Sequence, residues 1–230
     1  MGCGQRAAPR RREAGGPRQV RGCRAGDRGL RLGVLGGTFD PVHYGHLRLA
    51  ESAREAEELS LDRVLFVPAG QPWRKSDRVI SHARQRAAML DLAIEGNPAF
   101  EMSTLELERE GPSYTVDTLE FLHSQFPGSE LVLIMGEDAL ADLPNWRTPE
   151  RIVSLAQLAV ASRRESNRDP PHKSESLPVG TLERVIWVPM EPLQISGSAI
   201  RDKVRSGLSV RYLVPDAVRL YIADYGLYRE

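Results

Sequence analysis

The chain has very little cysteine: its only two cysteines, Cys3 and Cys23, lie within the first 31 of 230 residues. The rest of the chain therefore cannot depend on a disulfide, a thiol nucleophile or a cysteine-ligated metal. The sequence also lacks an apolar run near the roughly 20 residues of a transmembrane helix, and its start lacks the apolar segment of a secretory signal. These absences predict a cytoplasmic protein that does not bind a membrane.

A net positive charge is confined to the N-terminal segment. Residues 1–31 hold nine Arg and two acidic residues, a net of +7, whereas the other 199 residues carry a net of −7. Affinity for a phosphate backbone comes from Lys and Arg gathered on one surface, so this acidic body predicts no nucleic-acid partner. Residues 1–31 also contain no Ser or Thr, which disfavours an organellar transit peptide.

The N-terminal segment differs in composition from the rest of the chain. Residues 1–29 are rich in Arg, Gly and Pro without periodicity, which predicts a disordered extension. Alternatively, the translation start is mis-assigned, and the true start of the protein lies at Val20 or Leu30. Residues 30–230 have the length of one domain.

From residue 31 onward, short apolar runs alternate with helical patterns, which is typical of βαβ units around a parallel sheet. We expect strands at 30–36, 63–70, 99–105, 130–136, 157–163 and 184–190, and helices at 46–59, 81–96, 115–126, 148–155, 196–207 and 215–228. The predicted fold is α/β: a Rossmann-like doubly wound parallel sheet in a single domain, with a small C-terminal helical part. Ligands of such sheets bind at the carboxyl ends of the strands. The polar, proline-rich stretch 164–183 predicts a mobile surface loop.

The stretch "GGTFDPVHYGH" at residues 36–46 follows the first expected strand. Glycines there let backbone amides approach a phosphate, and the next helix offers free N–H groups and a positive dipole end. His43 and His46 lie three residues apart, so both imidazoles can face one point, and Gly45 between them carries no side chain to obstruct it. The pattern predicts a cradle for a polyphosphate.

Other interpretations of this stretch stay open on the residues alone. The glycine pair could form a tight turn, with the histidines as core or capping residues. The two histidines could also bind zinc, although no other His/Cys cluster supplies the remaining ligands. A P-loop is excluded because the chain contains no G-x-x-x-x-G-K-[ST], and the G-x-G-x-x-G fingerprint is missing too.

Two motifs resemble those of a known superfamily. Residues 36–46 match the G-x-F-D-P-x-H-x-G-H signature of the HxGH nucleotidyltransferases, and "ISGSAIR" (195–201) is similar to their second signature, I-S-x-T-x-I-R. More narrowly, residues 31–228 resemble bacterial nicotinate mononucleotide adenylyltransferases, through "VPAGQPWRKS", "GPSYTVDTL", "GEDALADLPNW" and "LVPDAVRLYIADYGLY". Ser198 replaces a threonine of the second signature and keeps a hydroxyl.

The resemblance implies adenylyl transfer from ATP to nicotinate mononucleotide, giving nicotinate adenine dinucleotide and pyrophosphate. The mononucleotide phosphate would attack the α-phosphate of ATP in line. Because this nucleophile is already ionised, the reaction needs positioning and charge neutralisation rather than a strong base. The implied partners are ATP and nicotinate mononucleotide. The implied cofactor is Mg²⁺ bound to phosphates, which needs no dedicated protein ligand.

The resemblance also implies roles for individual residues. The catalytic residues would be His43, His46 and Arg201. The residues that contact ATP would be Gly36, Gly37, Thr38, Phe39, Gly136, Asp138, Ile195, Ser196 and Ser198. The residues that contact the mononucleotide would be Lys75, Tyr114, Thr115 and Trp146, with the nicotinate ring on Trp146.

Several of these residues have simpler interpretations. Asp138 could be a helix N-cap, Lys75 one charge of a solvated pair, and Trp146 a packing residue over a helix start. The rival functions are transfer to another acceptor (nicotinamide mononucleotide, a sugar phosphate or phosphopantetheine), a non-catalytic nucleotide sensor, and an RNA-associated protein. We expect the tyrosines near the C-terminus to pack the last helix against the domain or to contact a second subunit, so homo-oligomerisation stays open.

Overall fold

The computed structural model describes residues 29–71, 80–162, 176–191 and 193–229. Three sequence predictions therefore lie outside the described residues: the extension up to residue 28, Lys75, and residues 164–175 of the expected surface loop. No helix in the described ranges is long and apolar enough to cross a membrane.

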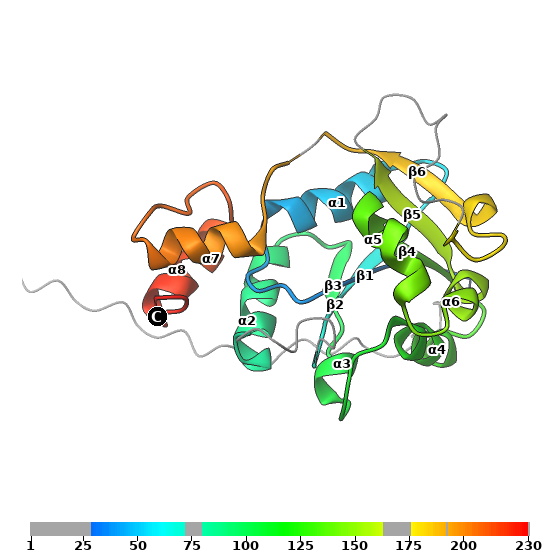
Figure 1. The fold of residues 1–230 in the computed structure, drawn as a ribbon, viewed down its shortest axis with the longest axis horizontal. Coiled ribbons are helices and arrows are strands. Elements are labelled where there is room, and N and C mark those ends of the chain that lie inside the picture. The colour runs from blue at the N-terminus through cyan, green and yellow to red at the C-terminus, as the bar shows by residue number, and fades with distance from the viewer. Residues whose placement is uncertain (1–28, 72–79, 163–175, 192, 230) are drawn as a thin grey trace, which may run out of the picture.

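A six-stranded parallel sheet forms the centre of the molecule, in the order β3-β2-β1-β4-β5-β6 (Figure 1). Its strands are β1 (Arg31–Gly37), β2 (Arg63–Pro68), β3 (Phe100–Met102), β4 (Glu130–Gly136), β5 (Gln157–Ser162) and β6 (Val185–Pro189). The strand order reverses between β1 and β4, so a crevice is expected beyond the carboxyl ends of these two strands. The predicted doubly wound sheet is confirmed.

Helices cover both faces of the sheet because successive side chains of a strand point to opposite sides. In β4, Leu133 and Met135 belong to one core and Val132 and Ile134 to the other. The first core is covered by α4 (Thr115–Gln125), α5 (Glu137–Asp142) and α6 (Pro149–Leu155), and the second by α1 (Tyr44–Glu55) and α2 (Ala83–Ile94).

The small C-terminal helical part is also confirmed. Helices α7 (Gly197–Arg205) and α8 (Asp216–Asp224) lie beside α2 at one end of the molecule, away from β5 and β6 (Figure 1). Helix α7 starts as the sequence indicates, because the Ser196 hydroxyl accepts a hydrogen bond from the backbone N–H of Ala199 at 3.2 Å. The sequence therefore places this helix start correctly.

The structure differs from the predicted elements at helix ends and in two short α-helices that were not predicted, one of which is α5 (Glu137–Asp142). Helix α1 begins at Tyr44 instead of residue 46, because His43 takes the extended N-cap conformation, and it ends at Glu55 because Ala56 is extended. The strand expected over 99–105 stops at Met102. A one-turn helix, α3 (Leu105–Glu108), follows that strand, and periodicity gave no sign of it.

Candidate active site

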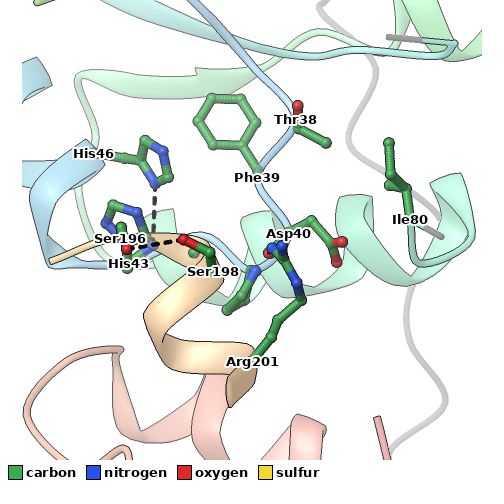
Figure 2. A pocket seen from close by; sticks show the side chains of 11 residues that line it. Thr38, Phe39, Asp40, His43, His46, Ile80, Ser196, Ser198 and Arg201 are labelled. Carbon is green, nitrogen blue, oxygen red and sulfur yellow. Dashed lines mark hydrogen bonds between the residues drawn. The ribbon is translucent and has the colours of Figure 1, made fainter. Parts of the chain in front are cut away.

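A pocket of about 230 Å³ opens where the loop after β1 meets the start of α7 (Figure 2). Segments 38–46 and 196–201 form most of it, although they are at least 150 positions apart in the chain. Seven predicted site residues line it: Thr38, Phe39, His43, His46, Ser196, Ser198 and Arg201. Asp40, Pro41, Ile80 and Gly197 complete the lining and were not predicted as site residues.

The two signature histidines stack on each other inside this pocket. Their ring centroids are 3.7 Å apart and the planes differ by 23°, with His43 at the N-cap of α1 and His46 in its first turn. The buried ring of Phe39 packs edge-on against His46 at 4.9 Å. The spacing of three residues thus brings the imidazoles together, as predicted.

The position of the proton on His46 follows from its hydrogen bond. Its Nδ1 atom accepts the backbone N–H of His43 at 3.2 Å, drawn as a dashed line in Figure 2. An accepting ring nitrogen carries no proton, so the neutral ring must carry its proton on Nε2, which becomes the donor. The capping interpretation of the histidines is therefore correct for the Nδ1 atom of His46.

His43 is buried and uncharged. Burial lowers its pKa from the ordinary 6.5 to about 4, because a charged imidazolium is poorly solvated there. Its buried Nδ1 atom has no hydrogen-bond partner within the described part of the chain. A Cβ atom at Gly45 would lie 3.0 Å from that nitrogen, so a glycine at 45 makes room for the ring.

The burial of His43 predicts how stability depends on pH. Between the folded pKa of about 4 and the ordinary 6.5, the unfolded chain binds more protons, so stability falls as the pH falls. Lowering the pH from 7 to 4.5 should cost about 2 kcal/mol of unfolding free energy through His43. Urea unfolding at several pH values measures this. His43→Asn places a polar side chain that does not titrate at the N-cap and should lose that part of the slope, and an unchanged slope would refute the assignment.

Helix α7 brings the third catalytic candidate to the pocket. Arg201 donates from Nη1 to the backbone carbonyl of Asp40 at 2.6 Å (Figure 2). The hydroxyl oxygens of Ser196 and Ser198 lie 3.2 Å apart at the start of this helix. A Cβ atom at Gly197 would come within 3.0 Å of the Asp40 carbonyl, so glycine permits this close approach.

The electrostatics of the pocket favour an anion. The N-termini of α1 and α7 both contribute lining residues, and helix N-termini attract phosphate through free N–H groups and the helix dipole. Asp40 is the one carboxylate among the described lining residues. It is already engaged, because its Oδ1 accepts the Tyr228 hydroxyl at 2.6 Å.

A buried arginine, which was not predicted from the sequence, binds the backbone of the loop that lines the pocket. Arg86 of α2 is 1% exposed and donates to three backbone carbonyls: those of Ser81 at 3.0 Å, Thr38 at 2.8 Å and Gly70 at 3.2 Å. It therefore joins the loops after β1 and β2 to the start of α2. In the sequence, the one indication that Arg86 is buried is its position on the apolar face of an amphipathic helix.

Five predicted ATP contacts do not line the pocket. Gly36 and Gly37 end β1, and Gly136 ends β4, so these glycines lie at the same edge of the sheet. Asp138 is exposed in the first turn of α5, where Gly136 is the N-cap, so the N-cap interpretation of Asp138 is wrong. Ile195 packs against the core on the side of α1 and α2. Their contacts with ATP stay predictions.

The residues predicted for the pyridine ring come from two segments that contact each other. Tyr114 is the N-cap of α4 and Thr115 its first residue. The guanidinium of Arg147 lies over the Tyr114 ring at 4.6 Å, which brings Trp146 close to the start of α4. Trp146 is half-buried against the core and donates from Nε1 to Asp142 at 3.0 Å. The packing interpretation of Trp146 is thus partly right, and its ring is fixed in place.

The class that this fold and pocket define is the nucleotidyltransferases. The cytidylyltransferase-like family model matches residues 34–203. A probable nicotinate-nucleotide adenylyltransferase of Thermomicrobium roseum is 49% identical over 86% of this chain and 92% of its own length. One of Roseiflexus sp. is 48% identical over 86% of this chain and 98% of its own length. The chain belongs to the nicotinate-nucleotide adenylyltransferase family.

Solved structures share the fold. A nicotinic acid mononucleotide adenylyltransferase of Plasmodium falciparum, complexed with NaAD, superposes with a TM-score of 0.68 at 17% identity, over 86% of this chain and 97% of that chain. A putative nicotinate-nucleotide adenylyltransferase of Vibrio parahaemolyticus has a TM-score of 0.62 at 19% identity, over 87% of this chain and 96% of that one.

Within the described ranges, no group of three or more His, Cys, Asp or Glu side chains could hold a metal ion.

Proposed function

We propose that this chain transfers the adenylyl group of ATP to nicotinate mononucleotide, giving nicotinate adenine dinucleotide and pyrophosphate, a step of NAD biosynthesis. The observation that carries the proposal is the pocket in which His43, His46 and Arg201 meet between two helix N-termini. The names of the Thermomicrobium and Roseiflexus relatives support the same reaction.

In the proposed reaction, an oxygen of the mononucleotide phosphate bonds to the α-phosphorus of ATP, and the bond from that phosphorus to the bridging oxygen breaks. Pyrophosphate leaves with the electron pair, and the attacking phosphate needs no deprotonation. The Nε2–H of His46 donates to the phosphates, since its Nδ1 is occupied. Arg201 donates its remaining N–H groups to the departing pyrophosphate. The chain thus contributes positioning and charge neutralisation.

Mg²⁺ fits this pocket as an ion carried on the phosphates of ATP. The carboxylate of Asp40, the one acidic side chain among the described lining residues, already accepts hydrogen bonds from Tyr228 and from the backbone N–H of Ser81. Magnesium keeps several waters and commonly binds through substrate phosphates, where it neutralises charge. No protein carboxylate is required to hold it.

The remaining predicted contacts belong to this proposal as well. Gly36, Gly37, Gly136, Asp138 and Ile195 would contact ATP beyond the phosphates. The nicotinate ring would stack on Trp146, whose face is fixed by its bond to Asp142. The start of α4, at Tyr114 and Thr115, would receive the carboxylate of the nicotinate ring, and Lys75 would lie near the mononucleotide.

The cytoplasmic location and the disordered extension stay predictions, and homo-oligomerisation stays open.

A pyrophosphate-release assay tests the function and its acceptor together. The full chain is incubated with ATP and Mg²⁺ and with nicotinate mononucleotide, nicotinamide mononucleotide or phosphopantetheine in parallel. We expect strong release with nicotinate mononucleotide and much slower release with the other two. Release with phosphopantetheine alone would move the chain to another acceptor. Binding of ATP without release in any reaction would favour the nucleotide sensor.

A further inference from the structure

The end of the chain returns to the pocket. After α8 the chain turns at Gly226, which has φ +62°, and the N–H of the buried Leu227 bonds to the carbonyl of Ile222 at 3.0 Å. This turn delivers Tyr228, whose hydroxyl donates to Oδ1 of Asp40 at 2.6 Å, across 188 positions of sequence. The turn that follows α8 therefore contacts the loop that carries the signature histidines.

The conformation of Tyr228 indicates that this contact is specifically held. Its φ is +65°, in the left-handed region that side chains other than glycine rarely adopt. Such a conformation persists only where the surroundings determine it strongly. Burial and the neighbouring Asp40 carboxylate raise the pKa of the Tyr228 phenol, so it remains a donor at all physiological pH values.

Asp40 connects Tyr228 to the residues that would act on ATP. The side chain of Asp40 accepts from Tyr228, while its backbone carbonyl accepts from Arg201 at 2.6 Å. Asp40 also lies three residues before His43 and lines the same pocket. A change in the orientation of Asp40 would shift both the guanidinium of Arg201 and the loop of residues 38–46.

We propose that Tyr228 is a positioning residue for adenylyl transfer, which acts through Asp40 to hold Arg201 and the loop of residues 38–46 in place. The proposal rests on the function proposed above. Tyr228 touches neither nucleotide and contributes no chemistry of its own. Its role is to reduce the freedom of groups that must meet the phosphates accurately, since a displacement of about 1 Å can cost up to 10²-fold in rate.

The test compares two tyrosine-to-phenylalanine variants of the full chain. Tyr228→Phe removes the hydroxyl that binds Asp40, and Tyr225→Phe removes the hydroxyl of a tyrosine on the outer surface of the same region, 63% exposed. At a temperature well below both unfolding midpoints, we expect kcat to fall about tenfold in Tyr228→Phe, with KM for nicotinate mononucleotide within about twofold of wild type. Tyr225→Phe should match wild type. An unchanged kcat in Tyr228→Phe, with or without a lower midpoint, overturns the proposal.

Two further measurements separate this proposal from the proposed function. The dissociation constant of a non-hydrolysable ATP analogue should rise several-fold in Tyr228→Phe and not in Tyr225→Phe. This readout needs no turnover, so an inactive wild type would contradict the function alone. In an Asp40→Asn background, Tyr228→Phe should add less than about a twofold loss, because both changes break the same connection. Fully multiplicative losses would show that Tyr228 does not act through Asp40.

Discussion

Replacing His46 by alanine should lower turnover by about 10²–10³-fold while the protein remains folded. The imidazole would lose the Nε2–H donor that we assign to the phosphates, and such donors contribute most when charge develops in a pocket away from water. The variant also loses the acceptor for the backbone N–H of His43, which should cost about 1 kcal/mol of unfolding free energy. Steady-state pyrophosphate release and urea unfolding measure the two effects.

A second variant separates the capping role of His46 from its chemical role. Glutamine at the third position of a helix can accept the same backbone N–H, so His46→Gln should recover the lost stability. Its flexible amide does not hold an N–H at the position of the imidazole Nε2–H while its oxygen caps the helix, so turnover should stay at least about tenfold below wild type. His82→Ala, at the exposed N-cap of α2, is the control and should behave as wild type. Near-normal turnover in His46→Ala would refute the assigned role.

Replacing Arg86 by methionine should give the largest loss of stability among these variants. The methionine keeps much of the side-chain volume, but three partly buried carbonyl groups lose their donor, those of Thr38, Gly70 and Ser81. Each unsatisfied buried acceptor costs about 1–3 kcal/mol, so we expect a loss of about 3 kcal/mol or more in unfolding free energy. This corresponds to a fall of roughly 6–12 °C in the unfolding midpoint of a chain of this size.

Arg84→Met is the matched control, since Arg84 lies on the same helix and is exposed. Its unfolding free energy should change by less than about 0.5 kcal/mol. Urea unfolding at pH 7, fitted with a common slope, compares the two variants directly. A loss below about 1 kcal/mol in Arg86→Met would mean that water or neighbouring groups satisfy the three carbonyls, and the stabilising role of Arg86 would be wrong.

The sequence by itself determined the fold class and most of the pocket. Apolar runs of β1, β2, β4 and β5 are buried on both faces, so they stand out as continuous strands between helical patterns. The two signatures contain the histidines, the serines and Arg201, because the groups of each signature are neighbours along one loop and helix start. Local patterns carry information of this kind, since spacing along a helix fixes which side chains can meet.

The tertiary structure alone decided what holds these groups in place. Asp40 was not predicted as a site residue, and nothing near Arg86 or Tyr228 in the sequence indicates that they bind the loop after β1. Their partners lie 48 and 188 positions away, and such contacts arise only when the sheet and α8 have packed. The tautomer of His46 and the neutral state of His43 likewise depend on a hydrogen bond and on burial. Periodicity and motif spacing describe neighbours along the chain, whereas burial and long-range hydrogen bonds are properties of the packed molecule.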